Sequence, residues 1–174
     1  FYQCPELGIK ESTNMGRGFV IDLSGKTALV TGGCRGIGGE ISRQLAMAGA
    51  DIIMNYYHSD VDREAAAILA TELEAGGSRV MLAEADVSSL SEVEIMVENA
   101  VREFGHIDIL VNNAAISTSA KFHEMSFEVW KQMQDVVLNG AFFVTKNVIS
   151  YMLRKGSGSI VMITTNCTIN GGGG

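Results

Sequence analysis

The sequence predicts an α/β fold with a doubly wound parallel sheet, and three features of the chain indicate it. Five short apolar runs alternate with segments whose apolar residues recur at helical spacing. Each run is almost continuously apolar, which is typical of parallel strands covered by helices on both faces. A glycine-rich turn follows the first run, at the edge where open parallel sheets bind their ligands.

Two regions are expected along the chain. Residues 1–22 are polar and lack periodicity, so we predict an N-terminal extension there and one domain over residues 23–174. Within the domain, the apolar runs predict five strands. In chain order they are residues 27–31, 51–56, 79–84, 107–112 and 159–164.

The helices are predicted from apolar residues three or four positions apart, together with signals at their ends. The first two are expected to end at Gly49 and Gly76. The third is expected to begin with a capping box, in which Ser89 and Glu92 satisfy free backbone N–H groups. A long fourth helix is expected from about Phe127 to Leu153. Its apolar stripe comprises Trp130, Met133, Val137, Ala141, Val144 and Val148.

Composition excludes several classes of protein. The net charge of −7, from 13 basic and 20 acidic residues, argues against nonspecific nucleic-acid binding. No apolar stretch approaches the ~20 residues of a membrane helix, so no membrane association is expected. Cys4, Cys34 and Cys167 lack metal-ligand spacing, so we expect no metal site, and reduced thiols in a cytoplasmic protein.

The glycine-rich turn, TGGCRGIGGE at residues 31–40, carries the chemical signal. Of its glycines Gly32, Gly36 and Gly38, one can make the sharp turn, another can admit a ligand to the backbone, and a third can let helix pack on strand. The free N–H groups and the helix dipole at this place favour a phosphate. The alternative is a set of plain turn glycines, but the position after the first strand favours phosphate binding.

Three motifs occur in register with the expected strands. The TGxxxGxG turn, the pair Asp86-Val87 and NNAA at residues 112–115 follow the first, third and fourth strands. Together they resemble the short-chain dehydrogenase/reductase family, over about residues 23–170. The resemblance implies a Rossmann-like sheet of about seven strands, of which five are expected here. Because five strands would leave an exposed apolar edge, we expect the native polypeptide to continue past Gly174.

The resemblance also implies a binding site for a nicotinamide dinucleotide. Asp86 would accept a hydrogen bond from the adenine amino group, with Val87 beside the ring, although a helix-capping role is the alternative for Asp86. Asn113 would line the ribose and also tie neighbouring strands together. The remaining cofactor residues implied by the motifs are Gly32, Gly36, Ile37 and Gly38 at the pyrophosphate, and Ala114 and Ala115 beside Asn113.

The end of the second strand bears on the choice between NAD and NADP. An NAD site usually carries a carboxylate there that binds the ribose 2′-hydroxyl. Tyr56 occupies that position, preceded by Asn55, so the carboxylate is missing. Arg35 lies inside the glycine turn, where its guanidinium could pair with a 2′-phosphate. We therefore predict NADP, with NAD as the alternative and a solvated Arg35 as the plainer interpretation.

The catalytic residues depart from the family's pattern. A tyrosine, a lysine, a serine and a helix asparagine act in this family. Thr165 stands at the serine position and keeps the hydroxyl, so it is the predicted catalytic residue. Val137 stands at the asparagine position. Asn139 lies about 200° further round an ideal helix and would face elsewhere unless the helix is distorted. The Tyr-x-x-x-Lys pair is expected beyond Gly174.

The sequence thus predicts an NADP-dependent oxidoreductase that acts on a small-molecule carbonyl or alcohol. The sequence segments VVLNG and ITT also resemble the 2,4-dienoyl-CoA reductase branch of the family, so enoyl reduction is one alternative activity. A dinucleotide-binding module without catalysis is the other alternative, favoured by Val137. Since family members commonly pair through the long helix, a homo-oligomer, dimer or tetramer, is expected.

Overall fold

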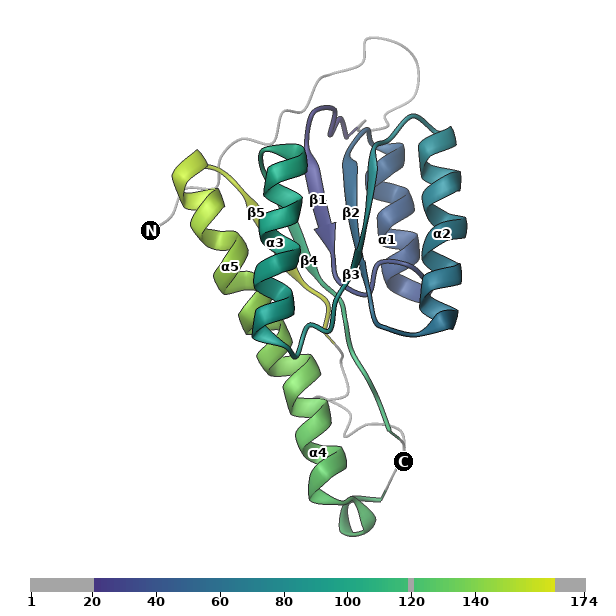
Figure 1. Cartoon of the computed structure of the whole chain (residues 1–174), viewed down its shortest axis with the longest axis vertical. Coiled ribbons are helices and arrows are strands. Elements are labelled where there is room, and N and C mark those ends of the chain that lie inside the picture. The colour runs from purple at the N-terminus through teal and green to yellow at the C-terminus, as the bar shows by residue number, and fades with distance from the viewer. Residues whose placement is uncertain (1–20, 119–120, 165–174) are drawn as a thin grey trace.

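The computed structural model describes residues 21–118 and 121–164, which form a parallel sheet with helices on both faces (Figure 1). The strand order is β3-β2-β1-β4-β5, and every neighbouring pair is parallel. This confirms the predicted doubly wound α/β architecture. The strands are β1 Thr27–Val30, β2 Asp51–Tyr56, β3 Val80–Glu84, β4 Ile109–Asn112 and β5 Ser159–Met162.

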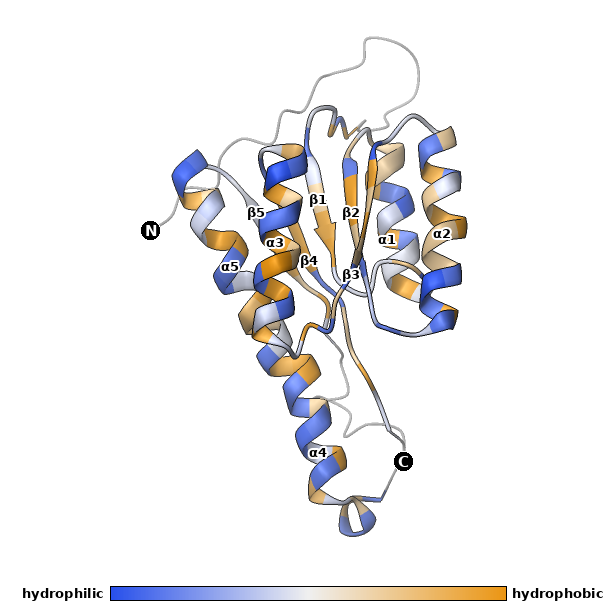
Figure 2. Ribbon diagram, viewed as in Figure 1, coloured by the Kyte–Doolittle hydropathy of each residue, from blue (hydrophilic) through white to orange (hydrophobic). Residues whose placement is uncertain are grey.

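The helices separate into two layers, each covering one face of the sheet. One layer contains α1 and α2, and the other contains α3 and α5, as Figure 1 shows. Figure 2 shows that the strands are apolar over most of their length, while the helices carry both apolar and hydrophilic residues. The helices are α1 Gly36–Met47, α2 Asp60–Ala75, α3 Leu90–Phe104, α4 Phe127–Gln134 and α5 Gly140–Lys155.

Alternate residues of the buried strands supply two separate cores. Leu29 and Ile53 belong to the cluster under α3 and α5, whereas Ala28, Ile52 and Met54 belong to the cluster under α1 and α2. All five side chains are fully buried. Since successive side chains of a strand point to opposite faces, a nearly continuous apolar run is what a sheet covered on both sides requires.

The predicted capping box of α3 is wrong. Ser89 is the N-cap residue, but its side chain makes no capping hydrogen bond. Glu92 Oε2 accepts the backbone N–H of Asp86 at 2.9 Å and lies 2.5 Å from Nε2 of His58. The glutamate therefore closes the loop before the helix, because its side chain can reach further back than the box geometry assumes.

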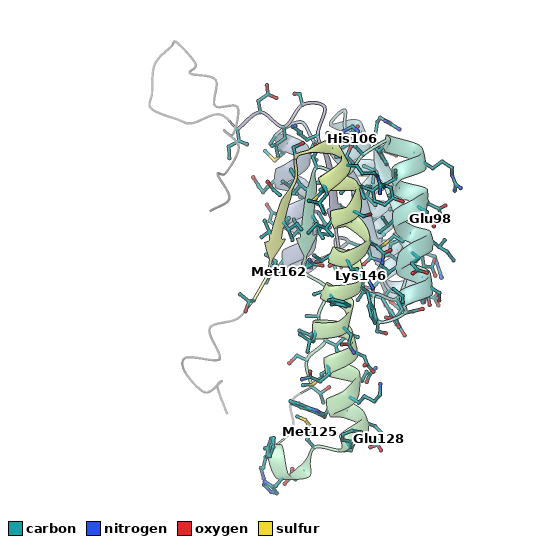
Figure 3. The ribbon with its side chains drawn as sticks, turned by 90° about the vertical axis from the view of Figure 1, so that its left-hand side faces the viewer. Glu98, His106, Met125, Glu128, Lys146 and Met162 are labelled. Carbon is teal, nitrogen blue, oxygen red and sulfur yellow. The ribbon has the colours of Figure 1, made fainter. Side chains whose placement is uncertain are left out.

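The long helix contains a distortion that local periodicity did not reveal. A π-helical turn over Asp135–Asn139 separates α4 from α5. α5 packs beside α3 and β4, while α4, with Met125 and Glu128 at its far end, projects beyond the sheet (Figure 3). Of the predicted apolar stripe, Val144 and Val148 are fully buried, whereas Trp130 and Val137 are exposed. Only the α5 half of the stripe is core.

The combined helix, Phe127–Lys155, is apolar enough to cross a membrane by length and composition alone, contrary to the expectation from the sequence. It has 29 residues and a mean hydropathy of 1.3 in its most apolar window. One such helix is weak support for a membrane span, because a core helix of a globular domain passes the same test. Val144 and Val148 pack against the sheet, so part of the apolar composition belongs to the core, although only 22% of that window is buried.

Candidate functional site

The glycine turn between β1 and α1 folds as the sequence predicts. Gly32 and Gly36 have φ angles of +59° and +55°, which side chains rarely adopt. A Cβ on Gly38 would lie 2.1 Å from the carbonyl oxygen of Gly32, so only glycine lets α1 approach the turn this closely. A Cβ on Gly36 would meet nothing within 4 Å. The turn is therefore open on the side of Gly36 and tightly packed beneath Gly38.

The N-terminus of α1 is suited to an anion. Its N-cap residue, Arg35, makes no side-chain capping hydrogen bond, and its first turn contains no acidic residue. The backbone N–H groups at the start of the helix are therefore not neutralised by a side chain. Together with the positive end of the helix dipole, they provide the donors that a phosphate group needs.

Asn113 and Thr31 hold β4 against the glycine turn. Nδ2 of Asn113 donates to the carbonyl oxygens of Thr31 and Gly32, at 2.9 and 3.1 Å. Oγ1 of Thr31 accepts the backbone N–H groups of Asn113 and Ala114, at 2.9 and 3.0 Å. Asn113 thus has the structural role that the sequence suggested, and it also borders the pocket described next.

A pocket of about 370 Å³ lies beyond the carboxyl ends of β1, β2, β3 and β4. Glycine-turn residues form one wall, and residues that follow the other three strands form the rest. This is the edge where an open parallel sheet binds its ligands. Eight of the eleven predicted cofactor residues line it: Gly32, Arg35, Tyr56, Asp86, Val87, Asn113, Ala114 and Ala115.

The other three predicted cofactor residues do not line the pocket. Gly36 and Ile37 are exposed at the start of α1, and Gly38 is buried beneath the turn. Gly36 and Ile37 can still present backbone N–H groups to an anion at the helix end. Gly38 acts through close packing, which is a structural contribution to the same site.

Arg35 is paired with a carboxylate that the sequence analysis did not identify. Nε of Arg35 donates a short hydrogen bond to Oδ1 of Asp62, and both residues line the pocket. Asp62 is only 8% exposed, and its Oδ2 accepts the hydroxyl of Ser59 at 2.8 Å. Burial raises the pKa of Asp62, but the hydrogen bonds from Arg35 and Ser59 outweigh burial, so the pKa lies below its usual range.

Asp86 lies in the turn before α3, whose N-cap residue is Ser89, and it also lines the pocket. Its Oδ1 accepts the backbone N–H and the hydroxyl of Ser88, at 2.8 and 2.7 Å, and so shapes the turn before α3. Its Oδ2 makes no hydrogen bond to the described residues and remains an acceptor at the pocket. Val87 is buried next to Gly140, where a Cβ would lie 2.8 Å from the valine side chain.

A second pocket, of about 210 Å³, adjoins the first. The two pockets share Val87, Ala114, Ala115 and Val136. Val137 lines the second pocket, whereas Asn139 does not: its Nδ2 donates to Oδ1 of Asp135 at 3.0 Å. The π-helical distortion therefore does not bring Asn139 into the second pocket, where the apolar Val137 lies instead. Thr165 lies outside the described residues.

Asn55 and Cys34 also line the first pocket and were not predicted as site residues. Nδ2 of Asn55 donates to the carbonyl oxygens of Ala83 and Ala85, and its Oδ1 accepts the N–H of Gly32 at 3.3 Å, so it joins three strands. Burial, followed by the charge of Asp62, raises the pKa of the Cys34 thiol. The polar residue inside the apolar second strand was the signal for Asn55, and the Ser59-x-x-Asp62 spacing was the signal for Asp62.

A cluster of polar side chains surrounds Glu84 near the end of β3, and Tyr56 connects it to the first pocket. His58 lies 3.1 Å from Glu84 and 2.5 Å from Glu92, and Glu84 also accepts hydrogen bonds from Arg63 and Tyr56. Hydrogen bonds to Glu84 and Glu92 raise the pKa of His58. The hydroxyl of Tyr56 is thus engaged with Glu84 at 3.3 Å. Burial and the charge of Glu84 raise the pKa of that hydroxyl.

Comparison with known proteins places this site in a family. Residues 26–173 match the family model described as short chain dehydrogenase. The solved structure of a mutant short-chain dehydrogenase/reductase of Serratia marcescens superimposes with a TM-score of 0.74 at 30% identity. The match covers 83% of this chain and 57% of the Serratia chain.

Several relatives have assigned activities. The chain is 36% identical over 145 residues to 3beta-hydroxysteroid dehydrogenase 2 of Eggerthella lenta, and 35% identical over 143 residues to a 3-oxoacyl-[acyl-carrier-protein] reductase of Synechocystis. It is 36% identical over 151 residues to L-rhamnose 1-dehydrogenase (NAD(P)(+)) of Sphingomonas. These matches cover 83%, 82% and 86% of this chain, but only 54%, 57% and 58% of the relatives. The chain therefore spans little more than half their length.

Proposed function

The chain belongs to the short-chain dehydrogenase/reductase family, and from this premise we propose that the protein is a nicotinamide-dinucleotide-dependent oxidoreductase. It would transfer a hydride between the cofactor and a small carbonyl or alcohol substrate. The observation that carries this proposal is the pocket of about 370 Å³, which unites the glycine turn, Asp86 and Asn113 at the ligand-binding edge of the sheet.

The residues of the two pockets fit such a cofactor. The uncapped N-terminus of α1 would hold the pyrophosphate, and Oδ2 of Asp86 would accept the adenine amino group. Asn113 donates hydrogen bonds to the carbonyl oxygens of Thr31 and Gly32 and so holds the glycine turn in the shape that pyrophosphate binding would need. The nicotinamide, when bound, supplies or accepts the hydride. The apolar walls of the adjoining pocket, among them Val87, Val136 and Val137, would exclude water from that ring.

We further propose that the preferred cofactor is NADP. We call the first pocket the adenosine pocket, because Asp86, the proposed partner of the adenine, lines it. Arg35 lines it too and its side chain is 65% exposed, so its guanidinium can reach a 2′-phosphate. Tyr56 supplies no carboxylate at the end of β2 for a ribose hydroxyl, and its own hydroxyl contacts Glu84. The name of one relative specifies NAD(P)(+), which is compatible with either dinucleotide.

For the substrate step we propose Thr165 as the hydroxyl that positions the substrate oxygen. Val137 offers no amide at the edge of the second pocket, so a proton relay through this position would have to use other groups. The dehydrogenase and reductase activities named for the relatives favour carbonyl or alcohol substrates over the enoyl substrates of the dienoyl-CoA alternative.

A second function rests on Val137 itself. Its apolar side chain lines the second pocket at the position where the family places an asparagine, which favours a dinucleotide-binding protein without catalysis. Both functions require the adenosine pocket. They differ in whether a bound dinucleotide is oxidised or reduced.

The test combines binding with turnover in the full-length protein. Titration with NADPH and NADH, followed by fluorescence, should show binding of both with NADPH tighter, and Arg35→Gln should weaken NADPH binding by about tenfold or more. NADPH oxidation with a panel of small ketones and aldehydes should exceed the rate without substrate. Binding without any turnover would support the non-catalytic function, and absence of binding would reject both.

The expected homo-oligomer is also a proposal. Leu138, Phe142 and Leu153 of the long helix are 62%, 59% and 70% exposed, so this helix presents an apolar outer face as well as a core face. We propose that two copies pair through this face, in a cytoplasmic protein. Light scattering should give a multiple of the protomer mass, and Phe142→Glu should reduce it. A monomer at micromolar concentration would reject the pairing.

A further inference from the structure

Asp62 occupies an unusual place for an aspartate. It lies in the first turn of α2, where Ser59 is the N-cap residue and accepts the backbone N–H of Asp62 at 3.1 Å. The sequence separates it from Arg35 by 27 positions, yet its carboxylate and the guanidinium meet in the adenosine pocket. No carboxylate stands at the end of β2, but the structure brings one to the same part of the site from the following helix.

The charges of this pair are almost balanced before any ligand arrives. Asp62 is 8% exposed and ionised, because the hydrogen bonds of Arg35 and Ser59 stabilise the carboxylate against the cost of burial. The start of α2 adds the favourable end of a helix dipole. Arg35 therefore faces the pocket as a cation whose field is partly cancelled by a fixed anion.

The guanidinium of Arg35 nevertheless keeps further hydrogen-bond donors after its contact with Asp62. Its Nε donates to Asp62, whereas its two terminal nitrogens donate no hydrogen bond to the described residues. Since a guanidinium has five N–H donors in a planar fork, it can hold a second anion while it keeps the first. A 2′-phosphate would then share Arg35 with Asp62, and the two anions would repel each other across it.

Resting on the proposed dinucleotide binding, we propose that Asp62 determines cofactor specificity by competing with the 2′-phosphate for Arg35. When NAD binds, the ion pair between Arg35 and Asp62 stays intact and neither charge loses its partner. With NADP, the phosphate gains Arg35 only against the field of Asp62. The wild-type site therefore accepts both dinucleotides and discriminates less than Arg35 alone would.

The experiment measures the adenosine end of the cofactor by itself. Dissociation constants of the full-length protein for adenosine 2′,5′-bisphosphate and for adenosine 5′-monophosphate are determined by calorimetry, and their ratio reports recognition of the 2′-phosphate. Asp62→Asn removes the charge while its amide oxygen can still accept the hydroxyl of Ser59. We expect the preference for the bisphosphate to rise roughly three- to tenfold, with the gain shrinking at high salt.

Two variants provide the controls. Glu72→Gln removes the carboxylate of the other ion pair between α1 and α2, in which Arg43 contacts Glu72 at 2.8 and 3.0 Å away from the pocket lining. It changes the net charge equally and should leave the ratio unchanged. Asp62→Ser repeats the test with a smaller side chain if the asparagine variant folds poorly, as judged by circular dichroism.

The Arg35→Gln background separates the two proposals. If Arg35→Gln lowers the ratio and Asp62→Asn has no effect in that background, the competition acts through Arg35 as proposed. If Arg35→Gln leaves the ratio unchanged, recognition of NADP through Arg35 is wrong. If Arg35→Gln lowers the ratio but Asp62→Asn leaves it unchanged or lowers it, Asp62 merely orients the arginine and the present inference is overturned.

Discussion

Two buried aspartates, each paired with a basic side chain, lie at opposite ends of the sheet. Asp62 lines the first pocket at the carboxyl ends of the strands, whereas Asp108 lies at their amino ends. Asp108, before β4, accepts the N–H of Thr27 at 3.1 Å and contacts Lys155 at 2.6 Å and His106 at 3.0 Å. Asp62, at the other end, has Arg35 as its only basic partner among the described residues. Figure 3 labels His106 at the first end and Met162 toward the second.

The difference follows from the polarity of parallel strands and their helices. α1, α2 and α3 all begin at the carboxyl end of the sheet, so free N–H groups and positive dipole ends gather there. At the amino end α5 finishes, with Lys155 as its last residue. Cations at that end saturate Asp108, whereas at the carboxyl end the paired Arg35 still has donors for a ligand.

The largest effect on stability and on dinucleotide binding is expected from a side chain added inside the glycine turn. Gly38→Ala would place a Cβ 2.1 Å from the Gly32 carbonyl oxygen and 2.5 Å from Nδ2 of Asn113. The backbone of the turn must shift, so we expect a loss of about 3 kcal/mol or more in unfolding free energy, and loss of dinucleotide binding. Urea unfolding and fluorescence titration measure the two effects.

Gly76, the C-cap residue of α2, provides a control glycine outside the glycine turn. Gly76 has a φ of −78°, and a Cβ there would come no closer than 3.2 Å, to the carbonyl oxygen of Leu73. Gly76→Ala should change stability by less than about 1 kcal/mol and leave binding intact. Equal stability losses in the two variants would contradict the special role of the turn.

The next largest effect on stability is expected at the amino end of the sheet, from a change at Asp108. Asp108→Asn leaves Lys155 without its anion and should lower stability at pH 7 by about 2 kcal/mol, without weakening dinucleotide binding. Burial alone would raise the pKa of Asp108, but Lys155 and the N–H of Thr27 hold that pKa below its usual range. The stabilisation is thus present above the unfolded-state pKa and is lost as pH falls through the folded-state pKa.

Unfolding in urea at pH 7 and at pH 3 measures this dependence. The difference between wild type and Asp108→Asn should be largest at pH 7 and should shrink at pH 3. A difference that stays constant over this range would show that the charge of Asp108 is not what stabilises the amino end.

A smaller effect is expected from the amide that ties β4 to the glycine turn. Asn113→Ala removes donors to Thr31 and Gly32 and should cost about 1 kcal/mol of stability and roughly tenfold in dinucleotide affinity. Asn147→Ala is the control, because it removes a comparable hydrogen bond away from both pockets. In the wild type, Nδ2 of Asn147 donates to the carbonyl oxygen of Phe143 at 2.9 Å. If both variants bind NADPH like wild type, Asn113 is structural only.

The smallest effect concerns the His58 bridge. Its pKa is raised by Glu84 and Glu92, so its stabilisation is full below the unfolded-state pKa of about 6.5 and is lost as pH rises through the folded-state value. Because the side chain is 43% exposed, we expect less than about 1 kcal/mol. Unfolding free energies of wild type should fall more between pH 6 and pH 8 than those of His58→Gln; parallel pH profiles would argue against the bridge.

Much of the fold was predictable because its signals are local. Apolar runs and helical spacing depend on neighbouring residues, and they gave β2 with its observed bounds, Asp51–Tyr56. β4 begins at Ile109, two residues later than predicted, because Asp108 is drawn into contacts at the amino end of the sheet. The glycines of the turn and the pair Asp86-Val87 were likewise evident, since turn geometry and motif spacing are properties of short segments.

The sequence by itself thus determined the layer architecture and eight of the residues that line the first pocket. Tertiary structure alone decided that Asp62 pairs with Arg35, that Glu92 closes the loop of Asp86 and that Val137 faces the second pocket. These contacts depend on how distant segments meet across the sheet and on a π-helical turn in a helix of regular periodicity. Periodicity specifies which face of an element is buried, but the position of one polar side chain relative to another is fixed only when the elements pack together.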